Sequence, residues 1–106
     1  LYNELVMEVG IEPSELALPK TYVLHQNYPN PFNPTTTILF GLPEAGNVKI
    51  VVFDVLGREM EVLVDHYLSS GTHAVKWDAT ELASGVYFYQ LEAGDSRQTR
   101  KLLLVK

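Results

Sequence analysis

From residue 35 to the end of the chain, apolar and polar residues alternate in short segments. In residues 35–42, Ile38, Phe40 and Leu42 fall on one parity, and in residues 58–64 Met60, Val62 and Val64 do. This alignment is typical of a strand with one buried face. The expected strands occupy residues 21–25, 35–42, 48–54, 58–64, 72–77, 85–92 and 97–105. About seven short strands without a long helix predict an antiparallel β-sandwich or a small barrel.

Residues 21–34 break this alternation. Three prolines and three asparagines fall within residues 27–34, together with two aromatic residues, Tyr28 and Phe32. Proline fixes φ and disfavours helix in the preceding residue, so this stretch is neither a helix nor a central strand. A disordered linker would not need two aromatic side chains. We therefore expect an ordered, extended segment in which Tyr28 and Phe32 pack on the surface of the sandwich.

The chain divides into three parts. Residues 1–11 alternate and indicate a strand; since a lone strand has nowhere to bury its apolar face, we expect it to be the last strand of an upstream domain. Residues 12–20 contain two prolines and no periodicity, which indicates a linker. Residues 21–106 hold the remaining strands and form the expected β domain.

Composition and charge narrow the function. The 106 residues carry 8 basic and 13 acidic side chains, a net charge of −5, which argues against nucleic acid or an anionic membrane as the main partner. There is no cysteine, and therefore no disulfide, thiolate metal ligand or thiol nucleophile. No apolar run approaches the roughly 20 residues that span a bilayer.

No catalytic or zinc-binding constellation emerges. The five serines and three histidines show neither a Gly-x-Ser-x-Gly elbow nor an acid–base pairing by spacing, and His66, His73 and Asp78 match no zinc pattern. We expect no enzyme, no cofactor and no small-molecule substrate. A weak calcium site is conceivable only if three loops share one end of the sandwich; their acids are Asp54, Glu59, Asp65, Asp78 and Glu81.

Four aromatic residues could stack on sugars: Tyr67, Trp77, Tyr87 and Tyr89. Trp77 shares its parity with Val75, however, so we expect it in the core between the sheets. Residues 85–92 are apolar on both parities, which favours a central strand. We expect Tyr87 to be buried or half-buried there, with its hydroxyl bonded to a neighbouring loop.

The last strand is basic and reaches the final residue. It carries Arg97, Arg100, Lys101 and Lys106 and no acid. Both of its parities are apolar near the end, so the strand is either covered on both sides or available to a partner. A receptor could add a strand to it or capture the terminal carboxylate; alternatively, the lysines only solvate an edge strand.

Several segments resemble one family, the type A C-terminal sorting domains of the type IX (Por) secretion system. The resemblance covers about residues 24–106. It is carried by Leu24–Ile38 with the block QNYPNPFNP, Leu42-Pro43, Val48–Asp54, Gly57-Arg58, Gly71–His73, Trp77-Asp78, Leu82–Tyr89, Lys101–Leu104 and Lys106. The middle portion is also similar, more weakly, to the immunoglobulin-like domain of flagellar hook-capping proteins. The resemblance implies an all-β, immunoglobulin-like antiparallel sandwich of about seven strands.

The resemblance also implies a function. Such a domain is a non-catalytic address that sends an attached cargo protein through the periplasm to the cell surface or exterior. The implied partners are an outer-membrane translocon, a sortase-like processing protease and the cargo domain joined upstream. The residues that would carry recognition are Asn27, Tyr28, Pro29, Asn30, Pro31, Phe32, Gly85, Tyr87, Lys101 and Lys106. The alternative is an accessory immunoglobulin-like module of a secreted glycoside hydrolase that binds polysaccharide or acts as a spacer.

Overall fold

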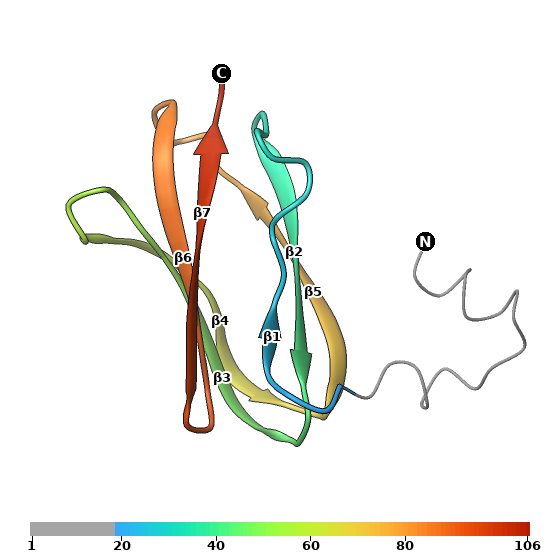
Figure 1. Cartoon of the computed structure of the whole chain (residues 1–106). Helices are drawn as coiled ribbons and strands as arrows, with labels where there is room; N and C mark the ends of the chain where they lie inside the picture. The colour runs from blue at the N-terminus through green and yellow to red at the C-terminus, as the bar shows by residue number, and fades with distance from the viewer. Residues whose placement is uncertain (1–18) are drawn as a thin grey trace, which may run out of the picture.

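A computed structural model describes residues 19–106, which form a sandwich of two antiparallel sheets (Figure 1). The expected strand 1–11 and most of the expected linker 12–20 lie outside the described residues. The strands are β1 (Val23–Leu24), β2 (Thr35–Leu42), β3 (Gly46–Phe53), β4 (Glu59–Leu68), β5 (Gly71–Asp78), β6 (Gly85–Ala93) and β7 (Ser96–Leu104). The seven-strand sandwich predicted from the alternation is confirmed. Within residues 19–106, no helix is long and apolar enough to cross a membrane.

One sheet has the strand order β1-β2-β5 and the other β4-β3-β6-β7. The core lies between them and is built from alternate residues of each strand, because successive side chains of a strand point to opposite faces. Strand β2 contributes Ile38, Phe40 and Leu42 to this core, and β7 contributes Leu102 and Leu104. The inward apolar side chains of the two sheets thus form one hydrophobic core.

Trp77 confirms the expectation for its strand. Its indole is 1% exposed and packs among the core residues. Strand β6 lies inside its sheet between β3 and β7, as its two apolar parities predict. Tyr87 is buried, and its hydroxyl donates to the carbonyl of Ala83 in the preceding loop at 2.7 Å.

Two expectations for the strand 58–64 are wrong: the residue at which it ends and the side chains that face the core. Strand β4 continues to Leu68 because its last four residues pair with the start of β3. Two register shifts in the β3–β4 pairing change which parity faces the core. As a result Val64 is buried, whereas Met60 and Val62 are each 39% exposed.

Candidate recognition surface

Residues 27–34, which we call the clasp, connect the two sheets at one edge of the sandwich. At one end, Tyr28 forms a β-bridge with Thr37 of β2, with both backbone hydrogen bonds made at 2.9 and 3.0 Å. At the other end, Phe32 forms a parallel bridge with Leu104 of β7. Three peptide bonds in the clasp, those before its prolines, are cis. The two bridges confirm that the segment packs on the sandwich, but it is not extended throughout, because the chain bends at residues 29–31 and 33–34.

Asn27 anchors the start of the clasp. Its side chain is buried, and its amide nitrogen donates to the carbonyl of Pro29 at 3.1 Å and to Thr36 Oγ1 at 3.0 Å. Its backbone N–H donates to the hydroxyl of Tyr89 at 2.8 Å, and that hydroxyl donates in turn to the carbonyl of His25 at 2.7 Å. Burial raises the pKa of Tyr89 to about 12. The tyrosine thus stays neutral and keeps its role as a hydrogen-bond donor.

Phe32 and Tyr28, the two aromatic residues of the clasp, behave differently. Phe32 is 2% exposed, and its ring centroid lies 5.6 Å from that of Trp77, which packs edge-on against Tyr87 at 6.3 Å. The expected packing of Phe32 is confirmed. The same expectation is wrong for Tyr28, which is 81% exposed. Its backbone alone pairs with β2, so its ring is left to solvent.

The clasp occupies the free edge of β7 near the C-terminus. The Leu103 N–H donates to Asn30 Oδ1 and its carbonyl accepts from the N–H of Phe32, both at 3.0 Å. The Val105 N–H donates to the carbonyl of Phe32 at 2.9 Å, and Gln26 Nε2 donates to the carbonyl of Lys101 at 2.7 Å. A receptor that added a strand at residues 101–105 would therefore have to displace the clasp.

The final residue is held at two points. The Lys106 N–H donates to Ser84 Oγ at 2.9 Å, and its ammonium donates to the carbonyl of Thr80. The Thr80 hydroxyl and N–H both donate to Asp78, and these bonds, with the Lys106 charge nearby, hold the pKa of Asp78 below its usual value. Gly85 follows Ser84 with φ +153°, a conformation that side-chain-bearing residues rarely adopt.

The structure thus gathers the expected recognition residues at one end of the sandwich. Gly85 and Tyr87 pair with Leu104 and Leu102 of β7, and Lys101 lies on the same strand. In Figure 1 the C-terminus, the beginning of β6 and the segment leading into β2 all lie at this end. Several of the expected residues are exposed to solvent: Tyr28, Pro29, Asn30, Pro31, Lys101 and Lys106. The buried ones instead hold this surface in place.

Sequence reasoning missed three residues that fasten this edge. Gln98 donates to the carbonyl of Tyr22 and accepts from the N–H of Leu24, while Arg100 Nε donates to the carbonyl of Leu24. The third is Tyr89, whose hydroxyl accepts from the N–H of Asn27 and donates to the carbonyl of His25. One signal was present: Gln98 and Arg100 are polar residues on the inward parity of Leu102, which indicates a neighbouring segment to bond.

The sequence also named a possible metal site and four possible sugar-stacking residues. In the described range 19–106, no three His, Asp or Glu side chains lie together so as to hold a metal ion. The possible calcium site required Asp65 to lie in a loop, but Asp65 belongs to strand β4. Of the four possible sugar-stacking residues, Trp77, Tyr87 and Tyr89 are buried, and only Tyr67 is exposed.

Comparison with known proteins was made on sequence and on structure. The sequence model of one family, described as "Secretion system C-terminal sorting domain", matches residues 26–106. That range begins one residue before the clasp and contains strands β2 to β7. The comparison with curated proteins gave no match.

Two solved structures share the fold. One is dimeric latent PorU from Porphyromonas gingivalis, with a TM-score of 0.62, 17% identity and coverage of 80% of this chain. The other is PorZ from the same organism, described as an essential bacterial surface component of the type IX secretion system, with a TM-score of 0.53, 23% identity and 88% coverage. The chain spans only 9% of the first protein and 12% of the second.

Proposed function

We infer that this chain, which belongs to the family of secretion system C-terminal sorting domains, directs an attached protein through the type IX secretion system to the cell surface or exterior. The observation that carries this conclusion is the family match over residues 26–106. The matched range coincides with the clasp and the six strands that follow it. The domain is therefore the address of an exported protein.

We further propose that the domain is not an enzyme and that its partners are an outer-membrane translocon and a sortase-like processing protease, met after passage through the periplasm. The family description, which is that of a sorting domain, supports this assignment. The burial of three expected recognition residues also supports it. Asn27, Phe32 and Tyr87 hold the clasp and the core together. Recognition requires a surface and not a water-excluding cleft.

The recognised surface, in this proposal, is the exposed end of the sandwich formed by the clasp and the C-terminus. Tyr28, Asn30 and Lys101 are exposed there and offer a ring, an amide and an ammonium group to a receptor. Lys106 lies close by, fastened to Ser84 and Thr80. These fastenings fix the position of the last residue relative to the clasp, so a receptor can read both together.

The function is tested by fusing the 106-residue chain to the C-terminus of a fluorescent protein that carries a Sec leader. The fusion is produced in a host with the type IX machinery, and fluorescence is measured in the medium, on the surface and in the periplasm. Export is expected with the chain and not without it, nor in a host that lacks the machinery. Retention of the folded fusion in the periplasm would refute the function.

The contribution of the C-terminus is tested by extending the same fusion past Lys106 with a short Gly/Ser tail. The tail leaves the core residues Leu102 and Leu104 in place, so the domain still folds. Slower export of the extended fusion would support a role for the end of the chain in recognition. Unchanged export would assign recognition to the clasp, which is then tested by Tyr28→Ala.

A further inference from the structure

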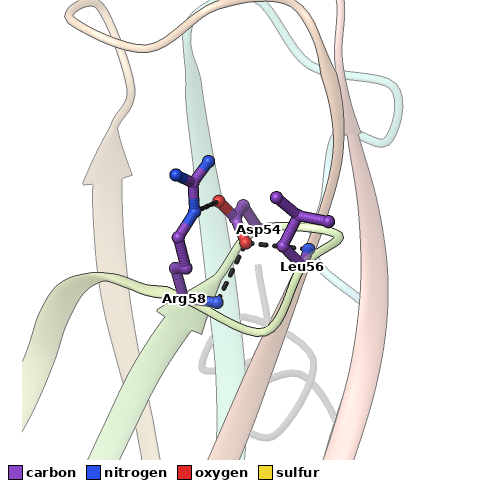
Figure 2. Close-up of polar contacts among 3 residues, drawn as sticks. All are labelled: Asp54, Leu56 and Arg58. Atoms are coloured by element: carbon purple, nitrogen blue, oxygen red, sulfur yellow. Dashed lines mark hydrogen bonds and ion pairs between the residues drawn. The ribbon is translucent and has the colours of Figure 1, made fainter.

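The turn between β3 and β4 is closed by its own residues. Asp54 Oδ1 accepts from the N–H groups of Leu56 and Arg58, both at 2.9 Å, and its Oδ2 accepts from Arg58 Nε at 2.7 Å (Figure 2). The backbone of Asp54 bonds the carbonyl of Arg58 and the N–H of Gly57, both at 3.0 Å. Gly57 has φ +82°, which favours glycine. The turn is therefore rigid without help from the rest of the sandwich.

This rigid turn presents two apolar side chains to solvent. Val55 is 65% exposed and Leu56 is 74% exposed. The connections between β2 and β3, β4 and β5, and β6 and β7 instead carry Pro43–Ala45, Ser69-Ser70 and Gly94-Asp95, which are typical of turns in water. Figure 1 shows the β3–β4 connection standing clear of the neighbouring β6–β7 ribbon. An apolar tip on a rigid, projecting turn is what an interface anchor requires, because little conformational freedom is lost on binding.

Arg58, beside this tip, favours a partner that carries a negative charge. Its Nε is held by Asp54, and Figure 2 shows its two terminal nitrogens pointing away from that carboxylate. The side chain is 71% exposed, so the outer edge of the guanidinium is available to a second carboxylate. Arginine is enriched among interface hot spots, and its guanidinium forms strong charge-assisted hydrogen bonds to carboxylates.

We propose that Val55, Leu56 and Arg58 form a docking element for a protein whose surface offers an apolar pocket beside a carboxylate. The proposal rests on the proposed function, since the partner would belong to the export machinery. The turn would be a second contact: it lies at the same end of the sandwich as the clasp, because Phe53 at the end of β3 pairs with Phe88 near the beginning of β6, but on the opposite edge of the four-stranded sheet. A protein pocket fits better than an anionic lipid surface, because Glu59 and Glu61 follow the turn on β4 and are exposed.

The test uses the fluorescent fusion with the double substitution Val55→Ser, Leu56→Ser. Loss of two anchor side chains is expected to slow export by about tenfold or more. The thermal unfolding midpoint is expected to change by less than about 3 °C, because both side chains are exposed. The matched control is Tyr67→Ser, which removes an equally exposed side chain, 65%, from another part of the surface.

The outcomes separate this proposal from the function itself. If the wild-type fusion is not exported, the function fails. If the wild type and the double variant are exported at the same rate, or if Tyr67→Ser slows export equally, only the docking element fails. The carboxylate beside the pocket is tested with Arg58→Gln, which removes the charge, and Arg58→Lys, which keeps it. Slower export of Arg58→Gln alone would support the carboxylate, and equal export rates of the two variants would overturn it.

Two further measurements exclude other occupants of the tip. In flotation with phosphatidylglycerol and phosphatidylcholine vesicles, binding that the double variant loses would overturn the proposal in favour of a lipid surface. In sedimentation velocity, self-association that the same variant loses would overturn it in favour of a second copy of the chain. A monomer that does not float, together with slow export of the variant, supports the protein pocket.

Discussion

The clasp and the β3–β4 turn are both irregular connections, but they are held in opposite ways. The clasp is bonded to residues far away in the sequence: Asn27 contacts Tyr89 and Asn30 contacts Leu103, across 62 and 73 positions. The bonds of the turn all remain within residues 54–58. The clasp directs Phe32 inward, whereas the turn directs Val55 and Leu56 outward.

This difference indicates that the clasp contributes to stability, whereas the turn exposes side chains for contact. The clasp depends on β7, because its partners include the backbone of Leu103 and Val105. The turn needs no distant partner, so its side chains are free for contact with another molecule. Changes to the buried residues of the clasp should lower the stability of the domain, and changes at the tip of the turn should not.

The largest expected effect is that of Phe32→Ala. Removal of this buried ring beside Trp77 should lower the free energy of unfolding by about 3–5 kcal/mol. Leu56→Ala, at the exposed tip, should change it by less than about 0.5 kcal/mol. Urea unfolding followed by Trp77 fluorescence measures both. Equal losses in the two variants would remove the distinction between clasp and turn.

The second-largest expected effect is a loss of stability at alkaline pH, where the Tyr89 hydroxyl at the start of the clasp ionises. The pKa of Tyr89 is raised from 10.0 to about 12 in the folded domain, so its contribution is complete below pH 10 and is lost as the pH rises through 12. The loss amounts to roughly 2–3 kcal/mol. It is measured as the free energy of unfolding at pH 8 to 12. Tyr89→Phe should lack this pH dependence; if the variant shows the same decline, another group is responsible.

Two asparagines of the clasp provide a matched pair for a smaller effect. Asn30→Ala removes the acceptor for the Leu103 N–H and should cost about 0.5–1.5 kcal/mol. Asn33, which also precedes a proline and is exposed, makes no corresponding bond to β7 in the described structure. Asn33→Ala should therefore be nearly neutral in the same unfolding experiment. The reverse order would show that the bond to Leu103 contributes nothing.

The smallest effect concerns the turn at acid pH. Hydrogen bonds from the Arg58 backbone and side chain, and from the Leu56 N–H, lower the pKa of Asp54. The turn is thus stabilised above pH 3.8 and loosens as the pH falls through the lower folded value. The protection factors for amide hydrogen exchange at Leu56 and Arg58 should fall there, without a change at Leu103. Asp54→Asn should abolish the pH dependence of the protection factors at these two amides.

Much of the fold could be predicted from the sequence because it depends on local periodicity. Alternation identified the strands and the buried Trp77, and apolar residues on both parities indicated the central position of β6. The prolines and aromatic residues of the clasp indicated an ordered segment. The bond of the Tyr87 hydroxyl followed from burial, since a buried hydroxyl needs a partner.

Other features depend on pairings that no local pattern encodes. The inward face of β4 changes at two register shifts with β3, so Met60 and Val62 came out exposed against expectation. Tyr28 pairs through its backbone and leaves its ring in solvent, which its residue type does not indicate. Gln98 and Arg100 acquired a role only because β1 lies beside β7.

By itself, the sequence determined the number of strands, the inward faces of strands such as β2 and β5, and the family, because each follows from residue type and spacing along the chain. The tertiary structure alone decided that the clasp closes the edge of β7 and that Lys106 is fastened to Thr80 and Ser84. It also decided that the β3–β4 tip stands free. The physical reason is that a strand's edge and a side chain's exposure are set by neighbours brought together from distant parts of the chain.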